Sequence, residues 1–255
     1  MLARYPITPE RYALITRIAL ALLVLIVFTG AAVRLTGSGL GCPTWPNCTE
    51  TSVHPSLNTH GLIEFGNRVL TFLVSAGVVL AALGAYLVTP ERRDLRYLAL
   101  SLPFGVLLQA IIGGLSVLFK LAPGWVMLHY LVSMVLLVWA FDLWWRSERA
   151  AEEVHEQRAD RTLVLLARGL MILGAIAIAL GTVSTAAGPH AGASGTGEFV
   201  GRFDFWGAET LRRVIHVHGY VVTVLGLGTV YAWWRSRRTG NDELTRTLLL
   251  TIALL

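Results

Sequence analysis

Six apolar stretches of about twenty residues each constrain the fold of this chain more than any other feature. They lie at about 12–33, 68–88, 96–119, 124–145, 163–187 and 213–234. A helix of about twenty apolar residues is long enough to cross the hydrocarbon core of a bilayer. Of the 255 residues 55% are hydrophobic and only 15% are charged, which is atypical of a soluble domain. We therefore predict an all-α polytopic membrane protein.

Arginines are concentrated in alternate links of the chain: before the first stretch, between the second and third, between the fourth and fifth, and after the sixth. Basic residues favour the cytoplasmic side of a membrane. This predicts a multi-pass protein of the cell membrane with a cytoplasmic N-terminus and an external first loop. The net charge of +5 then reflects topology, and no basic patch interleaved with aromatic residues in a polar domain indicates nucleic-acid binding.

A polar stripe opens the second apolar stretch. His60, Glu64, Asn67 and Arg68 are spaced three and four residues apart, so on a helix they share one face. Ionisable side chains at membrane depth cost several kcal/mol unless they are paired or face a cavity, so by default they indicate a functional site.

Both cysteines, Cys42 and Cys48, lie in the external loop just before this stripe. An oxidising compartment permits a disulfide there, and residues 43–47 are suited to the turn that would bring the thiols together. Such a pair is either a structural staple or a reducible pair beside a reaction site, and the sequence alone leaves both open.

Histidines also occur near the ends of apolar stretches. His129 opens the fourth stretch, and His216 and His218 open the sixth, two residues apart, so that only one of the two faces the interior of a helix bundle. Each is either a hydrogen-bonded packing residue or an axial haem ligand. The other histidines considered, His54, His155 and His190, lie in loops and are expected to be solvated.

A weak internal repeat relates the two parts of the chain. When Gly30 is aligned with Gly181, Asn67 and His216 fall 37 and 35 residues later, within two residues of register. This predicts tandem pseudo-symmetric four-helix bundles, residues 1–150 and 151–255. Glu64 precedes Asn67 by three residues, whereas Arg213 precedes His216 by three. The first half is therefore the expected place for chemistry, and the second the expected place for an anionic cofactor.

The second half is expected to be incomplete. A seventh apolar stretch begins near Leu244, and the sequence ends at Leu255, too soon to complete a crossing. His129 follows Asn67 by 62 residues, and the same interval after His216 falls beyond the end of the sequence.

The run Thr36–Cys42, the Trp-Pro pair before Cys48, and the segment Ile63–Arg68 resemble the haem A synthase family. The resemblance implies an eight-helix oxidoreductase that converts haem O to haem A by oxidising a ring methyl to a formyl group. It also implies a substrate haem in the N-terminal half and a haem b cofactor in the C-terminal half. The implied partners are haem O synthase and terminal oxidase assembly, with self-association also possible.

The family's site residues carry over by position. The resemblance implies that Glu64 takes part in the oxidation, that Cys42 and Cys48 form a disulfide, and that His129 and His216 ligate iron. Many members have histidine where this chain has Asn67, so His60, one turn earlier, is a candidate replacement ligand.

Two arginines at the outer ends of the first two stretches, Arg34 and Arg68, are candidates for pairing with haem propionates. The alternative for both is that they extend to the membrane interface. Two rival functions are a b-type cytochrome that only transfers electrons, which does not account for Glu64 or the cysteine loop, and a transporter built from repeats.

Overall fold

The computed structural model describes residues 6–151, 160–188, 192–193, 196, 200–240 and 242–254. These residues contain seven helices and no strand beyond isolated bridges. The helices are α1 (Pro9–Leu35), α2 (Thr59–Leu87), α3 (Arg93–Leu118), α4 (Pro123–Ala151), α5 (Arg161–Ala187), α6 (Thr210–Thr239) and α7 (Asp242–Leu254). The first six are long and apolar enough to cross a membrane, which confirms the prediction of an all-α polytopic membrane protein.

Helix α2 begins nine residues before the apolar stretch that predicted it. Asn58 caps its N-terminus, because the side-chain oxygen accepts a hydrogen bond of 2.7 Å from the backbone N–H of Gly61. The helix start therefore depends on a polar cap rather than on hydrophobicity. As a result, the whole polar stripe from His60 to Arg68 lies on the first turns of α2.

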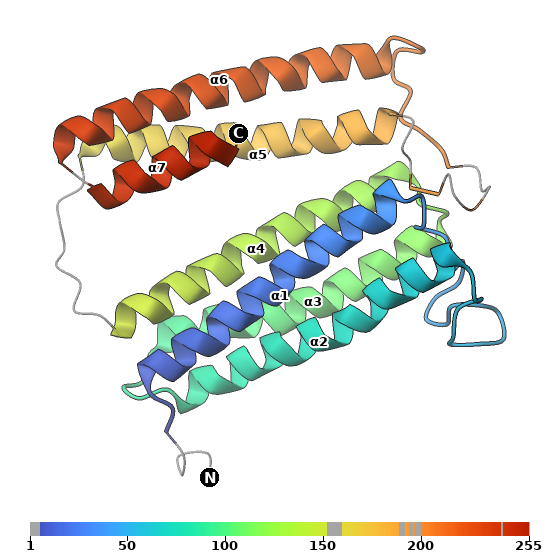
Figure 1. Cartoon of the computed structure of the whole chain (residues 1–255), viewed down its shortest axis with the longest axis horizontal. Helices are drawn as coiled ribbons and strands as arrows, with labels where there is room; N and C mark the ends of the chain where they lie inside the picture. Colours follow the sequence, from blue (N-terminus) through green and yellow to red (C-terminus); the bar gives the residue numbers. More distant parts are fainter. Residues whose placement is uncertain are drawn as a thin grey trace. The chain divides into compact units, whose positions relative to one another are not determined.

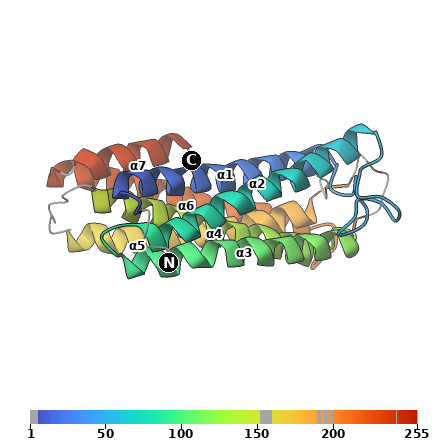
Figure 2. The same cartoon turned by 90° about the horizontal axis from the view of Figure 1, so that it is seen from below.

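Helices α1 to α4 form one compact unit, called unit 1 below, in which consecutive helices run side by side and α4 also packs on α1. The α1–α2 loop and the α3–α4 connection lie at the same end of this bundle (Figures 1 and 2). Unit 1 also includes the described part of the segment that links α5 to α6, namely residues 192–193, 196 and 200–202. Ala193 and Val200 are buried there against Leu40 and Val117.

The core of unit 1 is concentrated in one half of the bundle, away from the α1–α2 loop. It contains many small side chains, which allow helices to approach closely within a membrane. Gly84 of α2, for example, lies against Tyr12: a Cβ added at Gly84 would be 3.2 Å from the tyrosine ring. In the other half the packing is looser, because no residue of α4 between 123 and 135 is fully buried.

Helices α5, α6 and α7 form the second compact unit, called unit 2, together with the described residues from Phe203 to the start of α6. Helix α6 packs on both α5 and α7. Asp160 caps α5, accepting a hydrogen bond of 2.8 Å from the Thr162 N–H, and it also pairs with Arg235 of α6 at 2.9 Å.

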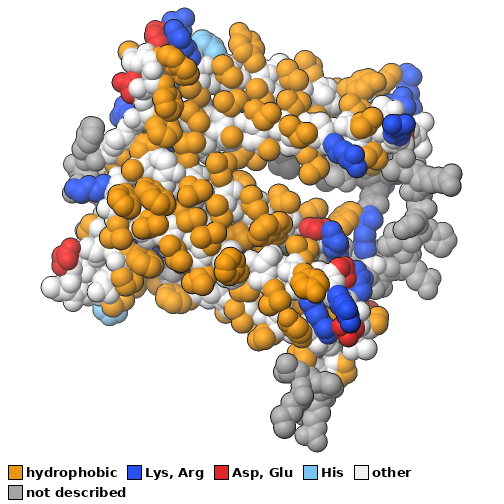
Figure 3. Space-filling model, turned by 180° about the vertical axis from the view of Figure 1, so that it is seen from behind, with side chains coloured by type: hydrophobic (Ala, Val, Ile, Leu, Met, Phe, Trp, Pro, Cys, Tyr) orange, Lys and Arg blue, Asp and Glu red, His pale blue; other side chains and the backbone are white. Residues whose placement is uncertain are grey.

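Apolar side chains cover the long faces of the helices, whereas charged side chains gather toward their ends (Figure 3). Large residues such as Phe28, Phe72 and Phe104 are more than two-thirds exposed, at 71%, 77% and 72%. Exposed aromatic rings in this number are unfavourable in water and favourable in lipid. The surface therefore agrees with a multi-pass membrane protein.

Candidate functional site

Glu64 is the carboxylate of the polar stripe on α2, and it is almost fully buried. Its Oε2 accepts a hydrogen bond of 2.7 Å from the backbone N–H of Cys42, and its Oε1 pairs with Arg68 Nη2 at 2.6 Å. Glu64 is thus held at the junction between α2 and the cysteine loop.

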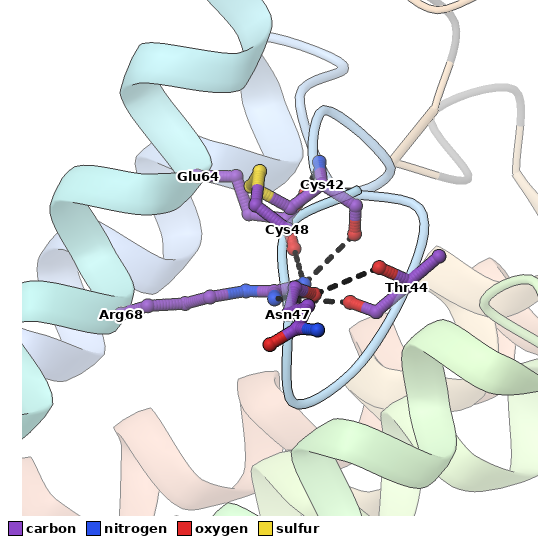
Figure 4. Close-up of polar contacts among 6 residues, drawn as sticks. All are labelled: Cys42, Thr44, Asn47, Cys48, Glu64 and Arg68. Carbon is purple, nitrogen blue, oxygen red and sulfur yellow. Dashed lines mark hydrogen bonds and ion pairs between the residues drawn. A yellow bond between two sulfur atoms is a disulfide. The ribbon is translucent and has the colours of Figure 1, made fainter. Parts of the chain in front are cut away.

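Arg68 connects α2 to the same loop through its guanidinium group (Figure 4). In addition to Glu64, it donates to the backbone carbonyl groups of Cys42, Thr44 and Asn47, at 2.8, 3.0 and 3.2 Å. These contacts were not expected from the sequence, although the i, i+4 spacing of Glu64 and Arg68 was a signal for the ion pair itself. Propionate binding by Arg68 stays a prediction.

The disulfide expected in the loop is present. Cys42 and Cys48 are bonded, with their Cα atoms 4.3 Å apart, and both residues are buried. The disulfide closes the turn whose carbonyl groups Arg68 binds. A structural role is therefore consistent with the contacts, while the redox alternative stays a prediction.

Two close approaches dock the loop on the bundle. A Cβ at Gly41 would lie 2.2 Å from the carbonyl oxygen of His60, so only glycine fits against the start of α2. A Cβ at Gly114 of α3 would lie 2.5 Å from the Trp45 ring. The loop therefore contacts α2 and α3 at two glycines, Gly41 of the loop and Gly114 of α3.

The other two residues of the stripe have different partners. His60 Nδ1 lies 2.9 Å from Ser38 Oγ, which in turn is 2.8 Å from Thr36 Oγ1. Asn67 Oδ1 accepts a hydrogen bond of 2.7 Å from Thr29 Oγ1 of α1. The stripe thus extends from the cysteine loop to α1, and a role of His60 or Asn67 at a cofactor stays a prediction.

His129 lies in the loosely packed half of unit 1. Its ring rests on α3, with Cε1 3.1 Å from where a Cβ of Gly113 would be. Its Nδ1 is buried and has no hydrogen-bond partner, while its backbone carbonyl accepts bonds of 2.9 Å from Gln109 Nε2 and from Ser133 Oγ. Buried imidazole nitrogens normally have a partner, so this atom is a candidate metal ligand.

In unit 2 the same arrangement occurs at His218. Its ring rests on α5, with Cε1 3.3 Å from where a Cβ of Gly181 would be, and its Nδ1 is also buried without a partner. His218 follows Gly181 by 37 residues, the interval that separates Asn67 from Gly30. His216, the residue preferred from the sequence, is exposed in the described structure. The contacts therefore favour His218 as the ligand candidate, and ligation by His216 stays a prediction.

A family model described as COX15-CtaA, cytochrome oxidase assembly protein, matches residues 13–60 and 56–255. The chain belongs to this family. Among similar curated proteins are the haem A synthases of Lysinibacillus sphaericus, 30% identical over 114 residues, and of Alkalihalophilus pseudofirmus, 30% identical over 129 residues. These matches cover 44% and 49% of this chain. They cover 37% and 42% of the relatives, so the chain matches about two-fifths of their length.

Arg34 and His54, two further residues considered from the sequence, are also described in the structure of this member of the COX15-CtaA family. Arg34 is half-buried near Gly192, with its Cγ 3.5 Å from where a Cβ of Gly192 would be. His54 is exposed beside the Phe65 ring. His155 and His190 lie outside the described residues. Within the described part of the chain, no group of three or more His, Cys, Asp or Glu side chains is placed to hold a metal ion.

Proposed function

We propose that this chain is a haem A synthase, which oxidises a ring methyl of haem O to a formyl group and so provides haem A for terminal oxidases. The observation that carries the proposal is the fixed carboxylate of Glu64 in the same four-helix unit as His129, whose Nδ1 has no partner. The matches to haem A synthases support it.

The residues of unit 1 fit a haem. An axial ligand requires an imidazole nitrogen that makes no other bond, and His129 offers one in the half of the bundle where α4 is loosely packed. Asn67 and His60 are the candidates on α2, and Arg34 is a candidate for a propionate. When bound, the haem supplies the iron for redox chemistry and the methyl carbon to be oxidised.

Glu64 has the proposed role of general base. Conversion of a methyl to a formyl group releases protons, and a carboxylate within hydrogen-bond reach is suited to accept them. The Cys42 N–H and Arg68 hold this carboxylate in one position, so it does not have to be ordered when substrate binds. The cysteine loop then serves as the support for the base.

Unit 2 has the proposed role of binding haem b, with His218 or His216 as ligand, and of passing electrons. The proposed orientation places the N-terminus in the cytoplasm and the cysteine loop outside. A haem O synthase is the proposed source of substrate. A plain b-type cytochrome gains no support, because the contacts that hold Glu64 have no role in electron transfer alone. A transporter gains none either, because helices α1 to α6 are continuous, unlike the broken helices of many transporters.

The test is chromatography of extracted haems, with pyridine-haemochrome spectra, from membranes that co-express the chain with a source of haem O. Haem A is expected with the unaltered chain. Glu64→Gln should retain bound haem and lose haem A, and His129→Ala should lose the haem of unit 1. His54→Ala, at an exposed position, is the matched control. Haem b without haem A from the unaltered chain would support the cytochrome instead, and unchanged haem A from Glu64→Gln would refute the role of Glu64.

A further inference from the structure

A six-residue motif occurs twice, at the C-terminal ends of α4 and α6. The sequence Trp-Trp-Arg-Ser-Glu-Arg spans residues 144–149, and Trp-Trp-Arg-Ser-Arg-Arg spans residues 233–238. The two copies differ only at the fifth position, which is Glu148 in α4 and Arg237 in α6. Neither copy takes part in the haem site proposed above.

Both copies are fixed to a neighbouring helix in the same way. Ser147 is buried, bonds to the Trp144 carbonyl at 2.7 Å, and lies 2.7 Å from Thr16 Oγ1 of α1. The corresponding distances for Ser236, also buried, are 2.8 Å to the Trp233 carbonyl and 2.9 Å to Thr245 Oγ1 of α7. The hydroxyl pair therefore sets the orientation of the motif in each unit.

The first tryptophan of each copy lacks a partner for its indole N–H. The Nε1 atoms of Trp144 and Trp233 are buried and have no hydrogen-bond acceptor. Buried indole N–H groups normally find an acceptor, and tryptophan at a membrane interface commonly places its N–H toward lipid headgroups. Each indole N–H therefore has no acceptor among the described residues, and it reaches an external oxygen atom only when the side chains that cover it move aside.

Arginines stack on the tryptophans four residues before them. The Arg149 guanidinium lies 4.1 Å from the Trp145 ring centre, and that of Arg238 lies 3.8 Å from Trp234. In α6 the additional Arg237 lies 5.1 Å from Trp233, next to the unpartnered N–H. A guanidinium stacked on a ring keeps its in-plane N–H groups available for hydrogen bonds to an anion.

The charge balance differs between the copies. In α4 the fifth residue, Glu148, is ion-paired with Arg17 of α1, and Arg146 pairs with Asp142. In α6 Arg235 pairs with Asp160, but Arg237 and Arg238 have no carboxylate partner in the part of the chain that the structure describes. Both are exposed at the end of a membrane-spanning helix. Among the described residues, the α6 copy thus has two positive charges without a carboxylate partner at the end of a helix that is long enough to cross a membrane.

We propose that the motif at 233–238 binds the phosphodiester of an anionic phospholipid. The exposed guanidinium groups of Arg237 and Arg238 are the first donors, and the buried Trp233 N–H becomes a further donor when the lipid displaces the side chains that cover it. The exposed rings of Tyr231 and Trp234 lie along the acyl-chain side of the site. The α4 copy does not share this preference, because Glu148 occupies the position of Arg237. A zwitterionic lipid binds more weakly, since its choline group is repelled by the two arginines.

The test uses the full chain in nanodiscs that contain equal amounts of phosphatidylglycerol and phosphatidylcholine, with retained lipids counted by native mass spectrometry. Affinity for phosphatidylglycerol is then measured by titration in a neutral detergent. Each arginine near a headgroup contributes roughly fivefold to affinity. Arg237→Gln should therefore weaken binding by about fivefold, and Arg237→Glu, which copies the α4 motif, by an order of magnitude or more.

Trp233→Phe should also weaken phosphatidylglycerol binding, because it keeps an aromatic ring and removes only the N–H donor. Arg93→Gln is the control: Arg93 is 83% exposed, lies at the start of α3 and contacts Glu91 at 3.5 Å, and no tryptophan ring is stacked on it among the described residues. Equal losses for Arg93→Gln and Arg237→Gln would overturn the proposal in favour of diffuse electrostatic attraction. Unchanged affinity in both Arg237→Glu and Trp233→Phe would also overturn it.

Inorganic phosphate and glycerol phosphate distinguish a lipid site from a site for a free anion. Neither should displace phosphatidylglycerol at millimolar concentration, and full displacement would overturn the lipid assignment. If Arg237→Glu fails to retain helical circular dichroism, Trp233→Phe and Arg237→Lys decide the question, since Lys keeps the charge and loses the planar fork. All these readouts are independent of haem and of the proposed synthase activity.

Discussion

Replacement of Gly41 by alanine tests whether the cysteine loop positions Glu64. The new Cβ would lie 2.2 Å from the His60 carbonyl oxygen and 2.4 Å from its carbonyl carbon, both backbone atoms that cannot rotate away. To reach 3.0 Å, the shortest separation that real Cβ atoms show, the loop must move by about 0.8 Å. The adjacent bond from Cys42 N–H to Glu64, now 2.7 Å, would then approach the limit of a hydrogen bond.

Loss of a hydrogen bond to a buried charged group costs about 2 kcal/mol, which corresponds to roughly a thirtyfold change in an equilibrium constant. Cys42 and Cys48 are 0% and 1% exposed, so reduction of their disulfide by a water-soluble phosphine requires the loop to open. The rate of reduction, followed by alkylation and mass spectrometry, should therefore rise about thirtyfold in Gly41→Ala.

Gly124→Ala is the control for this experiment, because no atom lies within 4 Å of the added Cβ. Its reduction rate should equal that of the unaltered chain. If Gly41→Ala is reduced no faster than Gly124→Ala, the loop is not held by its close approach to α2, and the argument for the support of Glu64 is refuted.

Further outcomes are expected at three other sites. Arg68→Lys should lower haem A yield at least tenfold, because lysine cannot reach Glu64 and three loop carbonyls together; unchanged yield by chromatography would contradict this. Gly113→Ala should displace the His129 ring, now 3.1 Å from the added Cβ, and shift the Soret band of bound haem, whereas Gly174→Ala, with open space, should not. The Thr162 N–H and then Arg235 hold the pKa of Asp160 below its usual value of 3.8. The ionised Asp160 carboxylate therefore stabilises unit 2 above pH 3.8, and this stabilisation declines as the pH falls through the lowered pKa of the folded state. Thermal unfolding between pH 7 and 3 should show this loss, and Asp160→Asn should remove that part of the pH dependence.

Hydrophobicity was sufficient to predict the six membrane-spanning helices, but it did not predict the polar start of α2 or the contacts of the loops. Six spans follow from length and composition, and the i, i+4 spacing on α2 indicated that Glu64 and Arg68 share a face. The contact of Arg68 with loop carbonyls was missed because backbone acceptors have no sequence signature. The preference for His216 over His218 rested on an approximate register, whereas the structure shows which ring faces α5.

The contribution of the α5–α6 segment to unit 1 was also missed, since periodicity contains no information on contacts between distant segments. The Gly39 N–H donates to the Gly192 carbonyl at 2.8 Å, and Ala193 and Val200 bury Leu40 and Val117. These pairings join residues more than seventy positions apart. A domain boundary at residue 150 therefore includes the four helices of unit 1 but leaves out the residues of the α5–α6 segment that pack on them.

This packing has a consequence for the order of biosynthesis. The first four helices leave the ribosome well before Ala193 and Val200, yet these two residues cover the apolar surface of Leu40 and Val117 next to the cysteine loop. That surface stays uncovered until the fifth helix has been translated and inserted. We therefore expect closure of the first bundle at this end to follow the insertion of the fifth helix.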